Sequence, residues 1–213
     1  MNLLLMALLT QIKGDFWSLG VWRMEESLTA LQDELSNTTL FEEATKQFTS
    51  LHRQLEWLSV RVLLYHLLHE HKEIGYLPSG KPYLVDGSYH LSISHTKGYV
   101  AVILGSTPVG VDIEQYGQRV HKVAHKYMRE GETVHPYQGD DTWSLLLHWS
   151  AKEVMFKCMN TAEVDFRKHL YIEPFVPQEQ GSFNAHEYRT ELQQSFKIDY
   201  LLHPDFVLTW HID

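Results

Sequence analysis

The sequence has one cysteine, few basic residues and no long apolar run. Cys158 has no partner for an internal disulfide or a CxxC metal site, which favours a cytoplasmic protein and a packing role for this thiol. Lysine and arginine number 18 against 27 acidic residues, and the formal net charge is −9. This balance argues against general nucleic-acid binding, which needs a basic surface. No stretch approaches the roughly 20 apolar residues of a membrane span, so no membrane partner is expected.

The chain of 213 residues, 44% of them hydrophobic, can fold as one large domain or two small ones. The apolar start, residues 1–9, lacks the basic region and cleavage site of a signal peptide and is expected to be a strand. Strands and helices mix without a regular βαβ rhythm, which predicts an α+β fold. A weak rhythm of strand, helix and strands in each half is compatible with two similar subdomains.

Apolar spacing and turn residues predict the elements between these ends. A three-stranded antiparallel meander is expected where short extended runs are separated by turns at 95–98 and 105–108. A polar loop at 138–141 should precede the helix that carries Glu153. The expected helices cover 27–35, 48–69 and 120–132, and the expected strands cover 16–22, 89–94, 99–104, 109–113 and 206–211.

The motif GVDIE at residues 110–114 places two carboxylates on one face of a strand. Successive strand side chains point to opposite faces, so Asp112 and Glu114 share one face while Val111 and Ile113 fill the other. Gly110 permits close backbone approach beside them. Such a pair is either a solvated polar face or part of a site for a hard oxygen-binding ion such as Mg²⁺.

A second motif, WSAKEVMFK at residues 149–157, places Glu153 and Lys157 one helical turn apart on the same face. The spacing of Ser150 and Glu153 also fits a capping box, in which Glu153 would satisfy backbone N–H groups at a helix start. The apolar residues from Trp143 onward suggest that the helix begins earlier. Capping and catalysis both remain open for Glu153 from the residues alone.

The segment GYLPSGK at residues 75–81 has the spacing of a phosphate loop, but Pro82 stands where a serine or threonine would bind Mg²⁺. A surface turn is therefore the preferred interpretation. His95 follows Ser94 at a strand end, where it is either a hydrogen-bonded turn residue or a contact for a ligand phosphate.

Taken in order, four pieces resemble the 4′-phosphopantetheinyl transferase superfamily, of the surfactin-synthetase-activating and enterobactin type. They run from about Arg53 to Lys157, and the likeness continues faintly to the C-terminus. The matching pieces are GKP at 80–82, LSISH at 91–95, PVGVDIE at 108–114 and WSAKE at 149–153 with Lys157.

The resemblance implies a pseudo-twofold α+β pair of similar subdomains, residues 1–105 and 106–213, with the active site in the cleft between them. The first would contact the nucleotide of coenzyme A, and the second would carry the Mg²⁺-binding carboxylates and the carrier-protein surface. The implied enzyme is a cytoplasmic monomer that moves the 4′-phosphopantetheine arm of coenzyme A to a serine of an acyl or peptidyl carrier protein, releasing adenosine 3′,5′-bisphosphate. The alternatives are a homologue that binds coenzyme A or a carrier without chemistry, and a phosphotransferase that uses a nucleoside triphosphate.

The resemblance also implies roles for individual residues. Asp112, Glu114 and Glu153 would hold Mg²⁺, and Glu153 is also the candidate base for the carrier serine. Lys157 would stabilise or protonate the leaving phosphate, with Lys152 as a second phosphate contact. The catalytic set is thus Asp112, Glu153 and Lys157. The residues implied in binding the nucleotide end of coenzyme A are Arg53, Lys81, Ser94 and His95, the last at the 3′-phosphate.

Departures from the family pattern fall in the N-terminal half. Family members often carry a basic cluster just before the long helix, whereas here Lys46, His52 and Arg53 are the available residues. Arg61 matches a family arginine within that helix but can equally pair with Glu56. Positive charge suited to an acidic carrier helix is expected around 120–127 and 159–170. It would come from Arg119, Lys122, Lys126, Arg167 and Lys168.

Overall fold

The computed structural model describes residues 7–35, 38–159 and 161–213, and the chain divides into two compact units. Unit 1 extends to Thr107 and unit 2 covers Pro108–Asp213. The mixture of helices and strands confirms the α+β class. No helix in the described ranges has both the length and the apolar character needed to cross a bilayer. The expected strand at 1–9 begins at Leu8, and residues 1–6 lie outside the described part.

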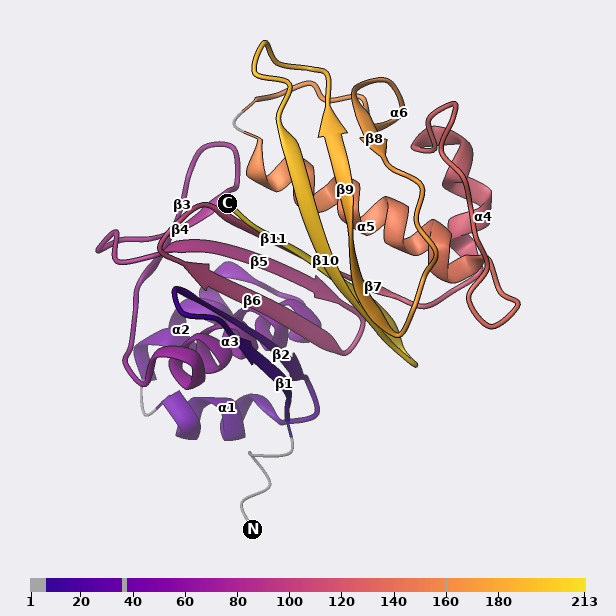
Figure 1. Ribbon diagram of the computed structural model, residues 1–213. Coiled ribbons are helices and arrows are strands. Elements are labelled where there is room, and N and C mark those ends of the chain that lie inside the picture. Colours follow the sequence, from indigo (N-terminus) through magenta and orange to yellow (C-terminus); the bar gives the residue numbers. More distant parts are fainter. Residues whose placement is uncertain (1–6, 36–37, 160) are drawn as a thin grey trace. The chain divides into compact units, whose positions relative to one another are not determined.

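Unit 1 is an antiparallel sheet in the order β1-β2-β6-β5, with three helices and a small hairpin (Figure 1). The expected helix at 48–69 is confirmed as α3, which ends where His69 takes a left-handed conformation, φ 57°. Most of its leucines and valines, among them Leu58 and Val62, are buried in the core of this unit. The elements are β1 Leu8–Lys13, β2 Trp17–Arg23, α1 Leu28–Leu35, α2 Thr38–Gln47, α3 Leu51–Leu68, β3 Ile74–Tyr76, β4 Pro82–Leu84, β5 His90–Thr96 and β6 Tyr99–Gly105.

Unit 2 is a second antiparallel sheet, in the order β7-β11-β10-β9-β8, with α5 against β7, β11 and β10 (Figure 1). The closing strand predicted at 206–211 is confirmed as β11. The elements are β7 Val109–Gln115, α4 Arg119–Val123, η2 Ala124–Lys126, α5 Thr142–Cys158, α6 Phe166–His169, β8 Leu170–Ile172, β9 Gln180–Glu187, β10 Ser195–His203 and β11 Phe206–Ile212.

The units share one connectivity. In each, a first strand (β2 or β7) leads to a long helix (α3 or α5), and a later hairpin (β5–β6 or β10–β11) returns its second strand to pair with the first. The two-part rhythm of the sequence corresponds to this repeated order. The boundary between the units lies two residues beyond the predicted one.

The predicted three-stranded meander is wrong in its third strand. β5 and β6 form the expected hairpin, but β7 pairs with β11 in the sheet of unit 2. Short-range turn signals cannot distinguish a hairpin from the connection between two units, because strand pairing is decided by partners far along the chain. Here the partner is more than ninety residues away, in the register Asp112 to Thr209.

Two other expectations are corrected. The helix predicted at 120–132 ends at Val123 and continues as one turn of 3₁₀ helix, Ala124–Lys126; beyond this turn, Glu132 forms an ion pair with the buried Lys152. The loop-like GYLPSGK segment spans the β3–β4 hairpin, where Leu77 N donates to Lys81 O at 3.0 Å and Gly80 has φ 85°. A phosphate loop needs a strand leading into a helix, so this reading is excluded.

Candidate active site

The carboxylates of Asp112 and Glu114 lie on the face of β7 that meets α5. Ser150 Oγ donates to Asp112 Oδ2 at 2.8 Å, and Trp149 Nε1 donates to a carboxylate oxygen of Glu114 at 2.7 Å. Val111 and Ile113, on the opposite face, are 0% and 1% exposed. The alternation predicted for this strand is thus present, and the acidic face meets a helix instead of solvent.

Gly110 lets α5 approach β7 closely enough to form these contacts. A Cβ atom at this position would lie 2.6 Å from Cys158 Sγ and 3.1 Å from Val154 Cγ1. Cys158 therefore has the packing role expected of it. The glycine at the start of the motif acts through packing: it brings the helix onto the acidic strand face.

Replacing Gly110 by alanine is expected to destabilise unit 2 by about 1–3 kcal/mol, the usual cost of overpacking a filled interior. Equilibrium urea unfolding would measure the change. Gly117→Ala is the matched control, because a Cβ there would meet no atom within 4 Å. Equal free energies of unfolding for the two variants would contradict a packing role for Gly110.

Helix α5 begins at Thr142, so Glu153 lies inside it and the capping-box alternative is wrong. Asp140 and Asp141 precede the helix, and Thr142 N donates to Asp140 Oδ1 at 2.8 Å. His121 also reaches this start, with Nε2 2.9 Å from Thr142 Oγ1. The side chains of His121, Asp140 and Asp141 offer ligand atoms within 4.8 Å of one another, but their contacts are those of a helix-anchoring network.

Lys157 brings positive charge to the acidic face. Its Nζ donates to Asp112 Oδ1 at 2.8 Å and to Val111 O at 2.9 Å. When Asp112, Glu114, Glu153 and Lys157 are all ionised, these four side chains carry two negative charges in excess. The sequence prediction that Glu153 and Lys157 share a face is consistent with their electrostatic coupling to each other and to Asp112.

The acidic groups perturb one another. Burial raises the pKa of Glu114 to about 7; the charge of Asp112 adds to the rise, and the Trp149 hydrogen bond opposes it. Burial and the charge of Asp112 likewise raise the pKa of Glu153, while Lys157 lowers it. Like charges have this effect only when they are close together in a poorly solvated place.

This donor set fits a divalent cation. Three carboxylates offer the hard oxygen ligands that Mg²⁺ prefers, and the excess of two negative charges equals the charge of the ion. Among the described residues, the oxygens of the three carboxylates do not all lie within 4.8 Å of one another, and Asp112 contacts Lys157 and Ser150 instead.

Trp149 and Ser150, which orient two of the carboxylates, were not singled out as site residues from the sequence. Both belong to the WSAKE motif, so its spacing contained the signal.

The prediction that Lys152 contacts a phosphate is wrong for this structure. Its side chain and that of Glu132 are both 0% exposed and form an ion pair of 2.8 Å. Nζ also donates to Tyr127 O at 2.7 Å and to Phe166 O at 3.4 Å, which accounts for all three donors of an ammonium. Lys152 is therefore an internal anchor that ties α5 to the segments around it.

In unit 1, Arg53 and His95 come together at a cavity of about 380 Å³, with Arg53 Nη1 3.3 Å from His95 Nε2. The exposed Lys81 follows Gly80, which lines the same cavity. Ser94 is adjacent to His95 on β5, so its side chain points to the opposite face of the strand, where it is buried. Three of the four residues implied in nucleotide binding thus lie in or beside one cavity, and Ser94 does not.

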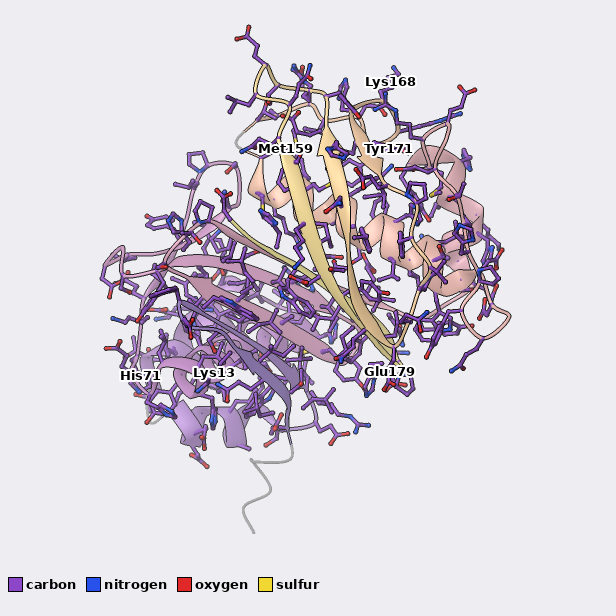
Figure 2. The ribbon with its side chains drawn as sticks, viewed as in Figure 1. Lys13, His71, Met159, Lys168, Tyr171 and Glu179 are labelled. Carbon is purple, nitrogen blue, oxygen red and sulfur yellow. The ribbon has the colours of Figure 1, made fainter. Side chains whose placement is uncertain are left out.

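Basic side chains gather on the outside of unit 2 near α4 and α6. Figure 2 shows Lys168 projecting outward and Met159 at the end of α5. Residue 160, inside the predicted carrier segment, lies outside the described part. The side chains expected to meet an acidic carrier helix are all exposed: Arg119, Lys122, Lys126, Arg167 and Lys168.

Comparison with known proteins assigns unit 2 to a family. The family model described as the 4′-phosphopantetheinyl transferase superfamily matches residues 108–210, nearly the whole of this unit. The 4′-phosphopantetheinyl transferase gsp of Aneurinibacillus migulanus is similar to the chain, with 31% identity over 83 residues. The matched part is 38% of this chain and 35% of that relative, so the chain spans about a third of the relative's length. The resemblance to this superfamily is confirmed for residues 108–210, which carry the PVGVDIE and WSAKE motifs and match its family model.

Proposed function

We propose that this protein transfers the 4′-phosphopantetheine arm of coenzyme A to a serine of an acyl or peptidyl carrier protein and releases adenosine 3′,5′-bisphosphate. The observation that carries this proposal is the buried acidic face of β7 and α5 within the family-matched unit. An acidic site with one lysine suits phosphoryl transfer, in which catalysis is mainly positioning and charge stabilisation.

Asp112, Glu114 and Glu153 are the residues that would hold Mg²⁺. When bound, the ion would draw charge from the pyrophosphate of coenzyme A. Ser150 and Trp149 fix the orientation of Asp112 and Glu114 through hydrogen bonds of 2.8 Å and 2.7 Å. A site whose ligands are held in this way loses less entropy when it binds its ion.

Glu153 is the base that we propose for the carrier serine. Its pKa is raised by burial and by Asp112, which makes the carboxylate a better proton acceptor than an exposed glutamate. Lys157 lies one helical turn further along and can neutralise or protonate the leaving phosphate oxygen. The two residues thus divide the proton transfers of the reaction between the attacking and leaving oxygens.

The nucleotide end of coenzyme A is assigned to Arg53, Lys81 and His95 of unit 1, and Ser94, whose side chain is buried, is not included. Aromatic rings of Phe48, Trp57 and Tyr76 line the same cavity as Arg53 and His95 and could stack on a base. The pseudo-twofold pairing of the units, a monomeric state and a cytoplasmic location stay predictions of the resemblance.

The decisive experiment is intact-mass spectrometry of apo carrier proteins incubated with this protein, coenzyme A and Mg²⁺. A gain of one phosphopantetheine that a chelator abolishes is expected. Apo forms of a fatty-acid carrier and of a peptide-synthetase carrier should both be tested. Absence of a gain on either, with coenzyme A still bound in a calorimetric titration, would overturn the transferase and favour a coenzyme A-binding module.

A further inference from the structure

A buried carboxylate occupies the centre of the basic residues in unit 1. Glu56, which is 7% exposed, lies 2.7 Å from Arg53 Nη1 through Oε2. Its other oxygen, Oε1, lies 3.1 Å from His52 Nε2 and 3.3 Å from His95 Nδ1. Helix α3 supplies three of these four side chains and β5 supplies His95. The group thus already contains the anion that a basic cluster would otherwise take from a ligand.

Arg53, Glu56 and His95 are mutual neighbours in this group. Arg53 can only donate, so His95 Nε2 must accept from Arg53 Nη1 for their 3.3 Å contact to be a hydrogen bond. Nδ1 of His95 lies on the side of Glu56, 3.3 Å from Oε1. The Glu56 carboxylate is thus the counter-charge that Arg53, His52 and His95 share.

The neighbouring cations are compensated in the same way. Arg61 is buried against the ring of Trp57, 3.1 Å from its centroid, and donates to Trp57 O at 3.0 Å. Lys46, on α2, lies 3.6 Å from a carboxylate oxygen of Glu42. Neither cation is left without a partner, and His52 and Arg53 share Glu56.

The cavity beside this cluster has the space and the aromatic walls to hold a nucleoside. Its volume is about 380 Å³, and Phe48, Trp57 and Tyr76 provide aromatic walls. Arg53 and His95 line it too, but so does Glu56. A phosphate dianion placed against Arg53 and His95 would also face the Glu56 carboxylate, and like charges in a partly buried place repel strongly. An adenosine without an added phosphate meets no such repulsion.

We infer that Glu56 determines specificity for the nucleotide end of the donor: its carboxylate stands in for the 3′-phosphate, so this chain uses 3′-dephospho-coenzyme A about as well as coenzyme A. The inference rests on the proposed function. With the dephospho donor, the serine oxygen forms a bond to the phosphorus that carries pantetheine, and the pyrophosphate P–O bond breaks. The serine proton passes to Glu153, and the leaving group is adenosine 5′-monophosphate.

The test compares kcat/KM for the two donors in the unmodified protein, in Glu56→Gln and in Glu25→Gln, which removes an exposed carboxylate that is paired with Arg23 and does not line the cavity. The unmodified protein and the Glu25 variant are expected to use both donors within about threefold of each other. Glu56→Gln removes the internal anion and is expected to raise the preference for coenzyme A by about tenfold, because like-charge repulsion of the 3′-phosphate is lost.

A preference of the unmodified protein for coenzyme A of more than about tenfold would overturn the inference, whatever the variant does. An unchanged donor ratio in a folded Glu56→Gln protein, checked by thermal melting, would also overturn it. Calorimetric binding of both donors separates this result from failure of the transferase. Equal affinities without transfer would leave the specificity intact and remove the chemistry, whereas binding of neither donor would overturn the inference.

Discussion

Replacing Asp112 by asparagine is expected to lower the rate of phosphopantetheine transfer by about a thousandfold, the upper range for loss of one preorganised charged group at a reaction centre. Asp112 is 4% exposed and is held by Ser150 on one oxygen and Lys157 on the other. An amide of the same shape preserves the hydrogen bond from Ser150 but removes the charge. The proposed ion would lose a ligand, and Lys157 would lose the partner that positions it.

The rate is measured by intact-mass spectrometry of the carrier over time at saturating Mg²⁺. Asp199→Asn is the matched control, because Asp199 lies on β10 in the same sheet. Its neighbour Tyr200 is in register with Thr209, which is in register with Asp112, so Tyr200 and Asp112 share one face of the sheet. Alternation places Asp199 on the opposite face. The control should keep its rate, and undiminished transfer by Asp112→Asn would remove the acidic face from the proposed mechanism.

The residues that local pattern could identify are those whose roles depend on neighbours in the chain. Alternation placed Asp112 and Glu114 on one strand face, and the apolar run from Trp143 placed Glu153 inside a helix; both hold in the structure. Strand alternation also separates Ser94 from His95. That rule was available in the sequence, but the family motif had grouped the two residues together.

The residues that local pattern could not identify depend on partners far along the chain. The pairing of β7 with β11 joins segments more than ninety residues apart, and no turn signal encodes it. The carboxylate of Glu56 is three residues from Arg53, a spacing that favours a pair, but the approach of His95 from β5 is set by tertiary packing. The pairing of Glu132 with Lys152 likewise needed the loop after η2 to fold back onto α5.

Lys152 and Lys157 lie five residues apart on α5 and are expected to respond oppositely to replacement by methionine. Lys152→Met should destabilise unit 2 by about 3–5 kcal/mol, since it leaves the Glu132 carboxylate buried without its counter-charge. Lys157 has a side chain that is 26% exposed, and Asp112 keeps the hydrogen bond from Ser150, so this replacement should cost less than that of Lys152. Lys157→Met should instead lose transfer activity, because the charge facing the leaving phosphate is gone.

Urea unfolding and the carrier-modification rate, measured on both variants, separate the two roles. The double variant Lys152→Met with Glu132→Leu should recover much of the lost stability, because removing both charges of a buried pair abolishes the uncompensated one. Loss of the Glu132 carboxylate would still leave the backbone N–H groups of Arg129 and Ile172 without their acceptor, so recovery should be incomplete. A Lys152→Met protein that is as stable as the unmodified chain but inactive would support the prediction that Lys152 contacts a phosphate. Loss of stability with activity retained in the folded fraction would establish Lys152 as the internal anchor of α5.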